Sequence, residues 1–274
     1  MIKRIADFIG RTSSTLPDDA LNALKAAYRR EAKGSSAKMI LATIIENAKV
    51  AAEAGTPLCQ DTGTLTFIVD ERLRSKATPA VFAKAVTLAT ERGCLRRNTI
   101  DSISGASIDT NACPGAPVVH YVDNSSGAIR LLMKGGGSEN MSAQFSLPDA
   151  AIGAGRDLEG VRKAVLTAVQ RAQGYGCAPG ILGVCIGGDR ASGYEEAKMQ
   201  LFRNLADVNQ DARLAKLERR ILKDANSLGI GPMGLGGKTT VLAVKIGARP
   251  RLPASFFVTV AYLCWAARRG EMKV

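Results

Sequence analysis

Apolar residues in much of the chain recur at the spacing of an amphipathic helix. After the acidic pair Asp18-Asp19, for example, Leu21, Leu24 and Tyr28 fall on one helical face. The same spacing, together with capping and stop residues, predicts helices over residues 17–28, 36–55, 79–93, 157–171, 195–205 and 210–222.

Short β-prone runs alternate with these helices. They cover residues 65–69, 117–122, 128–133, 181–186, 239–246 and 256–263. The turn signal Asn124-Ser125-Ser126-Gly127 predicts that the second and third runs form a hairpin. Because helices and strands are mixed without a linker or repeat, we expect an α/β (mixed α+β) fold, a single domain over residues 1–274 with helices packed on mixed sheets.

Glycine and polar residues gather in loops next to the strands. Residues 94–117 lose regular periodicity and predict one long loop. Three glycine-rich loops, among them residues 134–140 and 229–237, adjoin β-prone runs. Successive glycine amides can form a nest for an anion or a carboxylate, although each loop alone is also what an ordinary tight turn requires.

Composition narrows the class of protein. The 274 residues are 46% hydrophobic, which is enough for a sizeable core, and the net charge is +12. The basic residues follow predicted helices, as at 214–220 and 266–269, and aromatic residues are sparse. This distribution favours solvated helix faces and one anion site over a nucleic-acid-binding or scaffold protein, which stays the non-enzymatic alternative.

The chain is expected to be cytoplasmic and free of the membrane. No apolar run approaches the roughly 20 residues that a spanning helix needs. Asp7 interrupts the start of the chain too early for a secretory signal.

The cysteines are the candidate metal ligands of this sequence. The absence of a Cys-x-x-Cys pair argues against a zinc ribbon, and the spacing does not suit a disulfide framework. Separated cysteines can still converge on an iron–sulfur cluster, and three thiolates leave one iron open as a Lewis acid. Burial is the other interpretation for each cysteine alone, and it is favoured for Cys185, which lies in an apolar run. The six cysteines are Cys59, Cys94, Cys113, Cys177, Cys185 and Cys264.

Two other kinds of chemistry are disfavoured. The single histidine, His120, lies in the middle of a predicted strand, so acid–base work must come from carboxylates, Lys, Tyr or metal-bound water. Gly237-Lys238-Thr239 resembles part of a phosphate loop, but Pro232 occupies the required first glycine position and a β-prone run follows.

The corner Cys59-Gln60-Asp61 places a thiol, an amide and a carboxylate between a predicted helix and a predicted strand. This corner and four further motifs, in this order, resemble the α subunit of class I, iron–sulfur-dependent fumarate hydratases and the related L-tartrate dehydratases. The motifs are Cys59-Gln60-Asp61-Thr62-Gly63-Thr64, Leu95-Arg96-Arg97-Asn98, Lys134-Gly135-Gly136-Gly137-Ser138-Glu139-Asn140, the glycine-rich run 229–237 and Cys264-Trp265-Ala266.

The resemblance implies a [4Fe–4S] cluster with one open iron, ligated by Cys59, Cys177 and Cys264. It also implies that Asp61 transfers a proton at carbon. The residues that it implies for binding a small dicarboxylate are Gln60, Arg96 and the backbone amides of Gly135, Gly136 and Gly137.

The resemblance further implies a partner. Further substrate-binding side chains of the family come from a β half, so we expect this chain to be inactive alone and to join a separate β subunit in an α2β2 heterotetramer. The expected reaction is the hydration of fumarate to L-malate, a step of the tricarboxylic acid cycle.

One position departs from the family pattern. Where relatives carry a histidine that reaches the substrate, this chain has Leu252 in Arg251-Leu252-Pro253-Ala254-Ser255. This change implies one of three things: the substrate differs from that of the family, the activity is altered, or another residue takes the place of the histidine. The triple-glycine motif favours a fumarate hydratase, and the Cys-Trp-Ala ending favours the alternative, an L-tartrate dehydratase.

Overall fold

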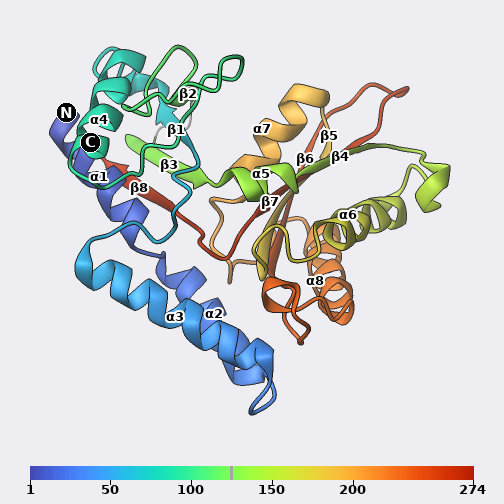
Figure 1. Ribbon diagram of the computed structural model, residues 1–274. Coiled ribbons are helices and arrows are strands. Elements are labelled where there is room, and N and C mark those ends of the chain that lie inside the picture. Colours follow the sequence, from blue (N-terminus) through green and yellow to red (C-terminus); the bar gives the residue numbers. More distant parts are fainter. Residues whose placement is uncertain (124–125) are drawn as a thin grey trace. The chain divides into compact units, whose positions relative to one another are not determined.

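The computed structural model describes residues 1–123 and 126–274, and the chain in it forms two compact units (Figure 1). The first unit comprises Met1–Pro17, Glu46–Gly136 and Ala266–Val274, and the second comprises Asp18–Ile45 and Gly137–Trp265. Each unit has its own four-stranded sheet and its own hydrophobic core. The predicted mixed α/β class is confirmed, whereas the single domain over residues 1–274 stays a prediction.

The sheet of the first unit has the strand order β2–β1–β3–β8. The central strand β1 pairs with β2 in parallel and with β3 antiparallel, and β8 pairs antiparallel with β3. The elements of this unit are α1 (Ile2–Ser14), β1 (Thr64–Asp70), a 3-10 turn (Glu71–Leu73), α4 (Pro79–Glu91), β2 (Val118–Val122), β3 (Ala128–Lys134) and β8 (Arg269–Lys273).

Helices α1 and α4 pack together, and α1 also contacts β3 and β8. Ile5 and Ile9 of α1 are fully buried in a core that also holds Phe67, Phe82 and Leu131. The rings of Phe67 and Phe82 lie with their centroids 4.4 Å apart. Burial of this apolar surface is the main force that holds the unit together.

The hairpin expected between residues 117–122 and 128–133 is wrong. Both runs are strands, but β1 lies between them, so that Phe67 pairs with Val119 on one side and Leu131 on the other. Asn124 and Ser125 of the turn signal lie outside the described residues. The local signal predicted a turn, but an inserted third strand decided the pairing.

The sheet of the second unit has the strand order β4–β7–β5–β6, in which only β5 and β6 run parallel. Helices α3 (Ser36–Ala54) and α5 (Gly136–Asn140) each continue from one unit into the other. The remaining elements are α2 (Asp18–Arg30), β4 (Ala143–Ser146), a 3-10 turn (Ala150–Ile152), α6 (Leu158–Ala172), β5 (Gly180–Gly187), α7 (Arg190–Gln200), α8 (Ala212–Ser227), a 3-10 turn (Pro232–Gly234), β6 (Val241–Arg249) and β7 (Phe257–Leu263).

Helices cover both faces of this sheet, as Figure 1 shows. Leu182 and Val184 of β5 face the core shared with α6 and α8. On the opposite face, α7 packs closely on Gly183, where a Cβ would lie 2.0 Å from the Ala197 carbonyl oxygen. The alternation along β5 thus fixes which helix lies on which face.

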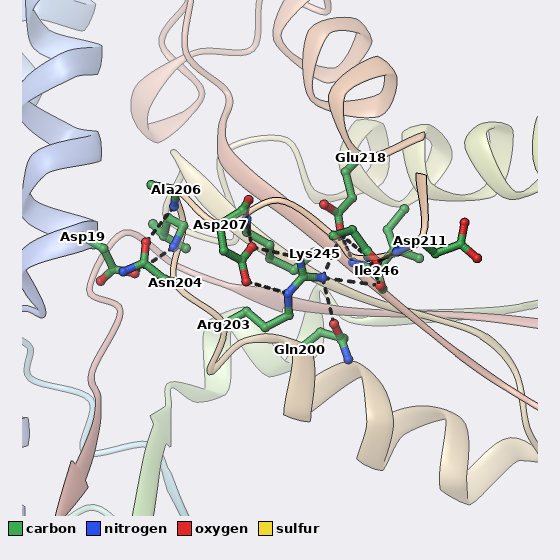
Figure 2. A network of polar contacts seen from close by, with 12 residues as sticks. Asp19, Gln200, Arg203, Asn204, Ala206, Asp207, Asp211, Glu218, Lys245 and Ile246 are labelled. Carbon is green, nitrogen blue, oxygen red and sulfur yellow. Dashed lines mark hydrogen bonds and ion pairs between the residues drawn. The ribbon is translucent and has the colours of Figure 1, made fainter. Parts of the chain in front are cut away.

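A charged network fastens the segment after α7 to β6 and α8 (Figure 2). Asp207 accepts from Lys245 at 2.6 Å and from Arg203 at 2.8 Å. Glu218 accepts from Arg203 at 2.8 Å and from the Ile246 amide at 2.7 Å. Each of these four charges has a partner of opposite sign, so the network leaves none of them uncompensated.

The other expected elements are confirmed with small shifts. Helix α7 begins at Arg190, earlier than the expected residue 195, because Asp189 and Ser192 form a capping box. Strand β8 was expected as part of a basic helix face. That expectation is wrong, since Arg268 and Arg269 are buried and Arg269 pairs with Leu132.

Among the described residues, no helix is long and apolar enough to cross a membrane.

Candidate active site

The Cys59-Gln60-Asp61 corner joins the end of α3 to β1, and Asp61 organises it. Asp61 Oδ1 accepts the Gly63 amide at 2.8 Å, which closes a tight turn. Gly63 has φ +75°, and a Cβ there would lie 2.7 Å from the backbone of Lys134. Only glycine fits this close approach of two backbones. The Asp61 amide in turn donates to Cys59 Sγ at 3.4 Å.

The second Asp61 oxygen reaches the triple-glycine loop. Oδ2 accepts the Gly136 amide at 2.7 Å, and a Cβ on Gly135 would lie 2.9 Å from the same oxygen. The structure therefore brings two of the sequence motifs into direct contact. Of the three glycine amides expected to bind substrate, that of Gly136 holds the Asp61 carboxylate.

A buried amide side chain, Asn111, shapes the loop that carries Arg96. Its Nδ2 donates to the Arg96 carbonyl at 2.8 Å, and its Oδ1 accepts from the amide and the hydroxyl of Thr99 at 3.1 and 2.8 Å. Thr62, which follows Asp61, donates to the same Arg96 carbonyl at 2.7 Å. The backbone of Arg96 is thus tied to the Asp61 corner, while the side chains of Arg96 and Gln60 are exposed.

A cavity of about 250 Å³ adjoins Asp61 in the first unit. Its walls are mostly polar or small side chains, which suits a small polar ligand better than an apolar one. The lining residues are Asp61, Gly63, Thr64, Leu65, Asn98, Thr99, Asn111, Ala116, Pro117 and Gly136.

In the second unit, Cys177 and Cys264 are neighbours. The Trp265 amide donates to the Cys177 carbonyl at 3.2 Å, and Cys177 has φ +53°, a left-handed conformation that is unusual for this residue. Cys264 is buried and Cys177 is half-buried. An irregular backbone of this kind is found more often at functional sites than elsewhere.

Tyr262 packs beside these two cysteines. A Cβ on Gly176 or Gly180 would lie 2.5 or 2.4 Å from its side chain, so the two glycines make room for the ring. Burial, and then the negative charges of Cys264 and Cys177, raise the pKa of Tyr262. Within the described residues, its buried hydroxyl has no hydrogen-bond partner.

The remaining cysteines differ in their surroundings. Cys185 is fully buried, and burial raises the pKa of its thiol to about 12, which confirms the expectation of a core residue. Cys94 and Cys113 are half-buried. In the described parts of the chain no three His, Cys, Asp or Glu side chains gather as a metal site. Cys59 belongs to the first unit and Cys177 and Cys264 to the second, so the three-cysteine ligand set stays a prediction.

The glycine-rich loop 229–237 does not present an open anion nest at its end. Both oxygens of the buried Glu31 carboxylate accept the Lys238 amide, at 2.9 and 3.0 Å. A Cβ on Gly237 would lie 2.6 Å from Ala37 Cβ. The anion at this loop is therefore the Glu31 side chain, and Gly237 allows the loop to pack closely against Ala37.

Leu252, where the resemblance implies a histidine, is 75% exposed. Arg251 donates to the carbonyls of Leu252, Pro253 and Ser255 and so holds the loop. Arg251 therefore holds the backbone of this loop, and the Leu252 side chain contributes no polar group to it.

Asn111 and Thr62 were not predicted from the sequence as residues that shape the site, and Arg268 was not predicted to be buried. Asn111 sits at φ +54° in a loop rich in turn residues, and asparagine is one of the few residues that tolerate this conformation. Arg268 looked like part of a solvated basic tail. No local signal distinguishes a buried arginine from an exposed one.

Comparison with known proteins agrees with these motifs. The fumarate hydratase (Fumerase) family model matches residues 2–273. A Geobacillus stearothermophilus protein named "Putative fumarate hydratase class I" is 48% identical over 271 residues, which are 95% of this chain and 52% of that protein. This chain thus spans about half the length of that relative.

Two relatives named as α subunits have nearly the length of this chain. The "Putative L(+)-tartrate dehydratase subunit alpha" of Methanocaldococcus jannaschii is 35% identical over 268 residues, 94% of this chain and 92% of that protein. The L(+)-tartrate dehydratase subunit alpha of Escherichia coli K12 is 30% identical over 276 residues, 98% of this chain and 89% of that protein. The match of the family model along nearly the whole chain shows that this protein belongs to the fumarate hydratase (Fumerase) family.

Proposed function

We propose that this chain is the α subunit of an iron–sulfur hydro-lyase, most directly a fumarate hydratase that interconverts fumarate and L-malate in the cytoplasm. The observation that carries the proposal is the 2.7 Å bond from the Gly136 amide to Asp61, which joins the Cys-Gln-Asp corner to the triple-glycine loop. The relative that is 48% identical bears the name of such an enzyme.

The donor set of the chain fits the proposed [4Fe–4S] cluster. Cys177 and Cys264 are adjacent, and Cys59 Sγ accepts a backbone amide, as a thiolate would. We assign Cys59, Cys177 and Cys264 as its ligands. When bound, a cluster held by three thiolates supplies a Lewis-acidic iron for the substrate hydroxyl and carboxylate.

The residues of the chain itself do the remaining work. Asp61 accepts the proton from carbon in the dehydration direction and returns it in the hydration direction. The amides of Gly63 and Gly136 hold its carboxylate in one orientation for this transfer. The guanidinium of Arg96 and the amide of Gln60 bind substrate carboxylates. The ordered backbone at Arg96 reduces the conformational freedom that binding must restrict.

The proposal includes a separate β subunit in an α2β2 assembly. Two relatives that nearly match this chain in length are named as α subunits. The match covers 52% of the Geobacillus relative, so the rest of that polypeptide is long enough to hold the counterpart of a β subunit.

Anaerobic co-expression with a candidate β chain tests the proposal. The purified complex should be brown and should form malate from fumarate. Serine in place of Cys59, Cys177 or Cys264 should abolish both properties, whereas Cys113→Ser and Cys185→Ser should leave the colour unchanged. Loss of the colour in Cys185→Ser with retention in Cys264→Ser would show that the ligand assignment is wrong. The α chain binding arbitrary DNA with a steep salt dependence, without lyase activity, would favour the basic binding protein instead.

L-tartrate dehydration is the second candidate reaction. The 35% and 30% identical relatives are named for it, and Leu252 replaces the histidine expected of the family. The ratio of kcat/KM for fumarate and L-tartrate in the same preparation decides between the two. In Leu252→His, a gain in fumarate hydration with a new dependence on pH near the ordinary histidine pKa would show that the position faces the reaction.

A further inference from the structure

Arg268 is a buried cation, and two of its three guanidinium nitrogens have no hydrogen-bond partner within the described residues. The residue is 1% exposed, and the two nitrogens are Nε and Nη1. By contrast, the comparably buried Lys245 is paired with Asp207 at 2.6 Å. Burying an unpaired charge is costly, and proteins normally pair such groups or use them.

The backbone places Arg268 beside the Asp61 corner, within the first unit. The Met133 amide donates to the Arg268 carbonyl at 2.9 Å, which fixes the residue against the strand that leads into Gly135. A Cβ on Gly135 would lie 3.8 Å from Arg268 Nη2 and 2.9 Å from Asp61 Oδ2. The guanidinium and the carboxylate therefore flank the same glycine.

Asp61 does not neutralise this guanidinium. Its two oxygens are held by the amides of Gly63 and Gly136, and no ion pair joins the two side chains in the described parts of the chain. An anion bound beside Gly135 would compensate the charge of Arg268, whose Nε and Nη1 atoms lack a hydrogen-bond partner among the described residues.

We propose that Arg268 binds a carboxylate of the substrate, at the carbon from which Asp61 takes the proton. This inference rests on the proposed hydro-lyase function. When that proton moves to Asp61, the electron pair it leaves is drawn toward the adjacent carboxylate, whose growing negative charge the buried guanidinium stabilises. The pair then forms the carbon–carbon double bond as the hydroxyl group leaves the neighbouring carbon. Arg268 is thus a substrate-binding residue in addition to Arg96 and Gln60.

The test compares the full chain with Arg268→Met and Arg268→Lys, using thermal unfolding with and without fumarate or L-malate. Arg130→Met is the matched control, because Arg130 lies in the same unit on β3 in a partly exposed ion pair with Glu271. Without ligand, Arg268→Met should unfold at the same or a higher temperature than the parent chain, since it removes an unpaired buried charge. With dicarboxylate, the parent chain and Arg130→Met should shift upward.

Arg268→Met should bind the dicarboxylate about tenfold to a hundredfold more weakly, the range expected for a lost charged hydrogen bond, and Arg268→Lys should fall between. The inference is overturned if Arg268→Met lowers the unfolding temperature of the unliganded chain, if no dicarboxylate shifts the parent chain, or if the shift is equal in both.

The outcomes for the two proposals are separate. If the complex with its β partner hydrates fumarate and Arg268→Met leaves kcat/KM unchanged, the Arg268 inference fails and the proposed function stands. If dicarboxylate binding depends on Arg268 but neither fumarate nor tartrate is converted, the proposed function fails and the binding site stands.

Discussion

Asp61 and Gly136, which are 75 positions apart in the chain, are joined by a 2.7 Å hydrogen bond from the amide to the carboxylate. This bond lets one side chain combine a structural role with the proposed chemical one. It orients the carboxylate and anchors the start of α5.

Asp61→Asn should separate these roles. The asparagine oxygen can still accept the Gly63 amide, but its NH2 group would face the Gly136 amide. Because this amide is exposed to water, we expect a loss of about 0.5–1.5 kcal/mol in the free energy of unfolding. Malate formation by the complex should fall by about a hundredfold or more, as expected for loss of a general base. Urea unfolding and initial rates measure the two effects.

Asp101→Asn is the control for Asp61→Asn. Asp101 accepts the amides of Ile103 and Ser104 in an exposed turn of the same unit. Its change should affect stability slightly and the rate not at all. Equal losses of rate in the two variants would contradict the role of Asp61.

Asn111→Asp should misplace the Arg96 loop. The substitution keeps the shape of the side chain but points an oxygen at the Arg96 carbonyl, now bonded to Nδ2 at 2.8 Å. We expect a loss of about 1–3 kcal/mol in the free energy of unfolding and a raised KM for the dicarboxylate. Asn111→Gly, which tolerates φ +54° but removes the side chain, should also raise KM. An unchanged KM in both variants would show that the loop does not position a binding residue.

The Asp207 network should make stability depend on pH in the acid range. Burial acts to raise the pKa of Asp207, but hydrogen bonds from Arg203 and Lys245 outweigh it and lower the pKa below its ordinary value. The stabilisation is therefore fully present above the ordinary aspartate pKa of about 3.9 and is lost as the pH falls through the lowered pKa.

Urea unfolding across this range should show a smaller pH dependence in Asp207→Asn than in the parent chain. Asp109→Asn, which changes an exposed carboxylate in the loop before β2, should keep the parent dependence. Identical slopes for all three proteins would mean that Asp207 contributes nothing to the acid sensitivity.

Gly180→Ala should destabilise the second unit. Its Cβ would lie 2.4 Å from the ring of Tyr262, which is only 1% exposed, so we expect a loss of about 1–3 kcal/mol in the free energy of unfolding. Gly137→Ala is the control, since its Cβ would meet nothing closer than 3.8 Å and should change stability by less than about 0.5 kcal/mol. Denaturant midpoints of the two variants measure the difference, and a stable Gly180→Ala would show that the Tyr262 pocket is loose.

The sequence by itself determined most of the regular elements and the motifs, but not α1, β4 or β8. Residues 36–55 and 65–69 match α3 and β1, because helix stops and β-branched runs act locally. The Cys59-Gln60-Asp61 corner was recognisable for the same reason, since neighbouring residues of a turn stay neighbours in any fold.

Only the tertiary structure decided what pairs with what. It placed β1 between β2 and β3 and buried Arg268 beside Gly135. It also brought the Glu31 carboxylate to the Lys238 amide at the end of the glycine-rich loop 229–237. Each of these depends on contacts between residues far apart in the chain. The free energy of burying a charge or pairing a strand is set by those contacts and leaves no trace in the local pattern.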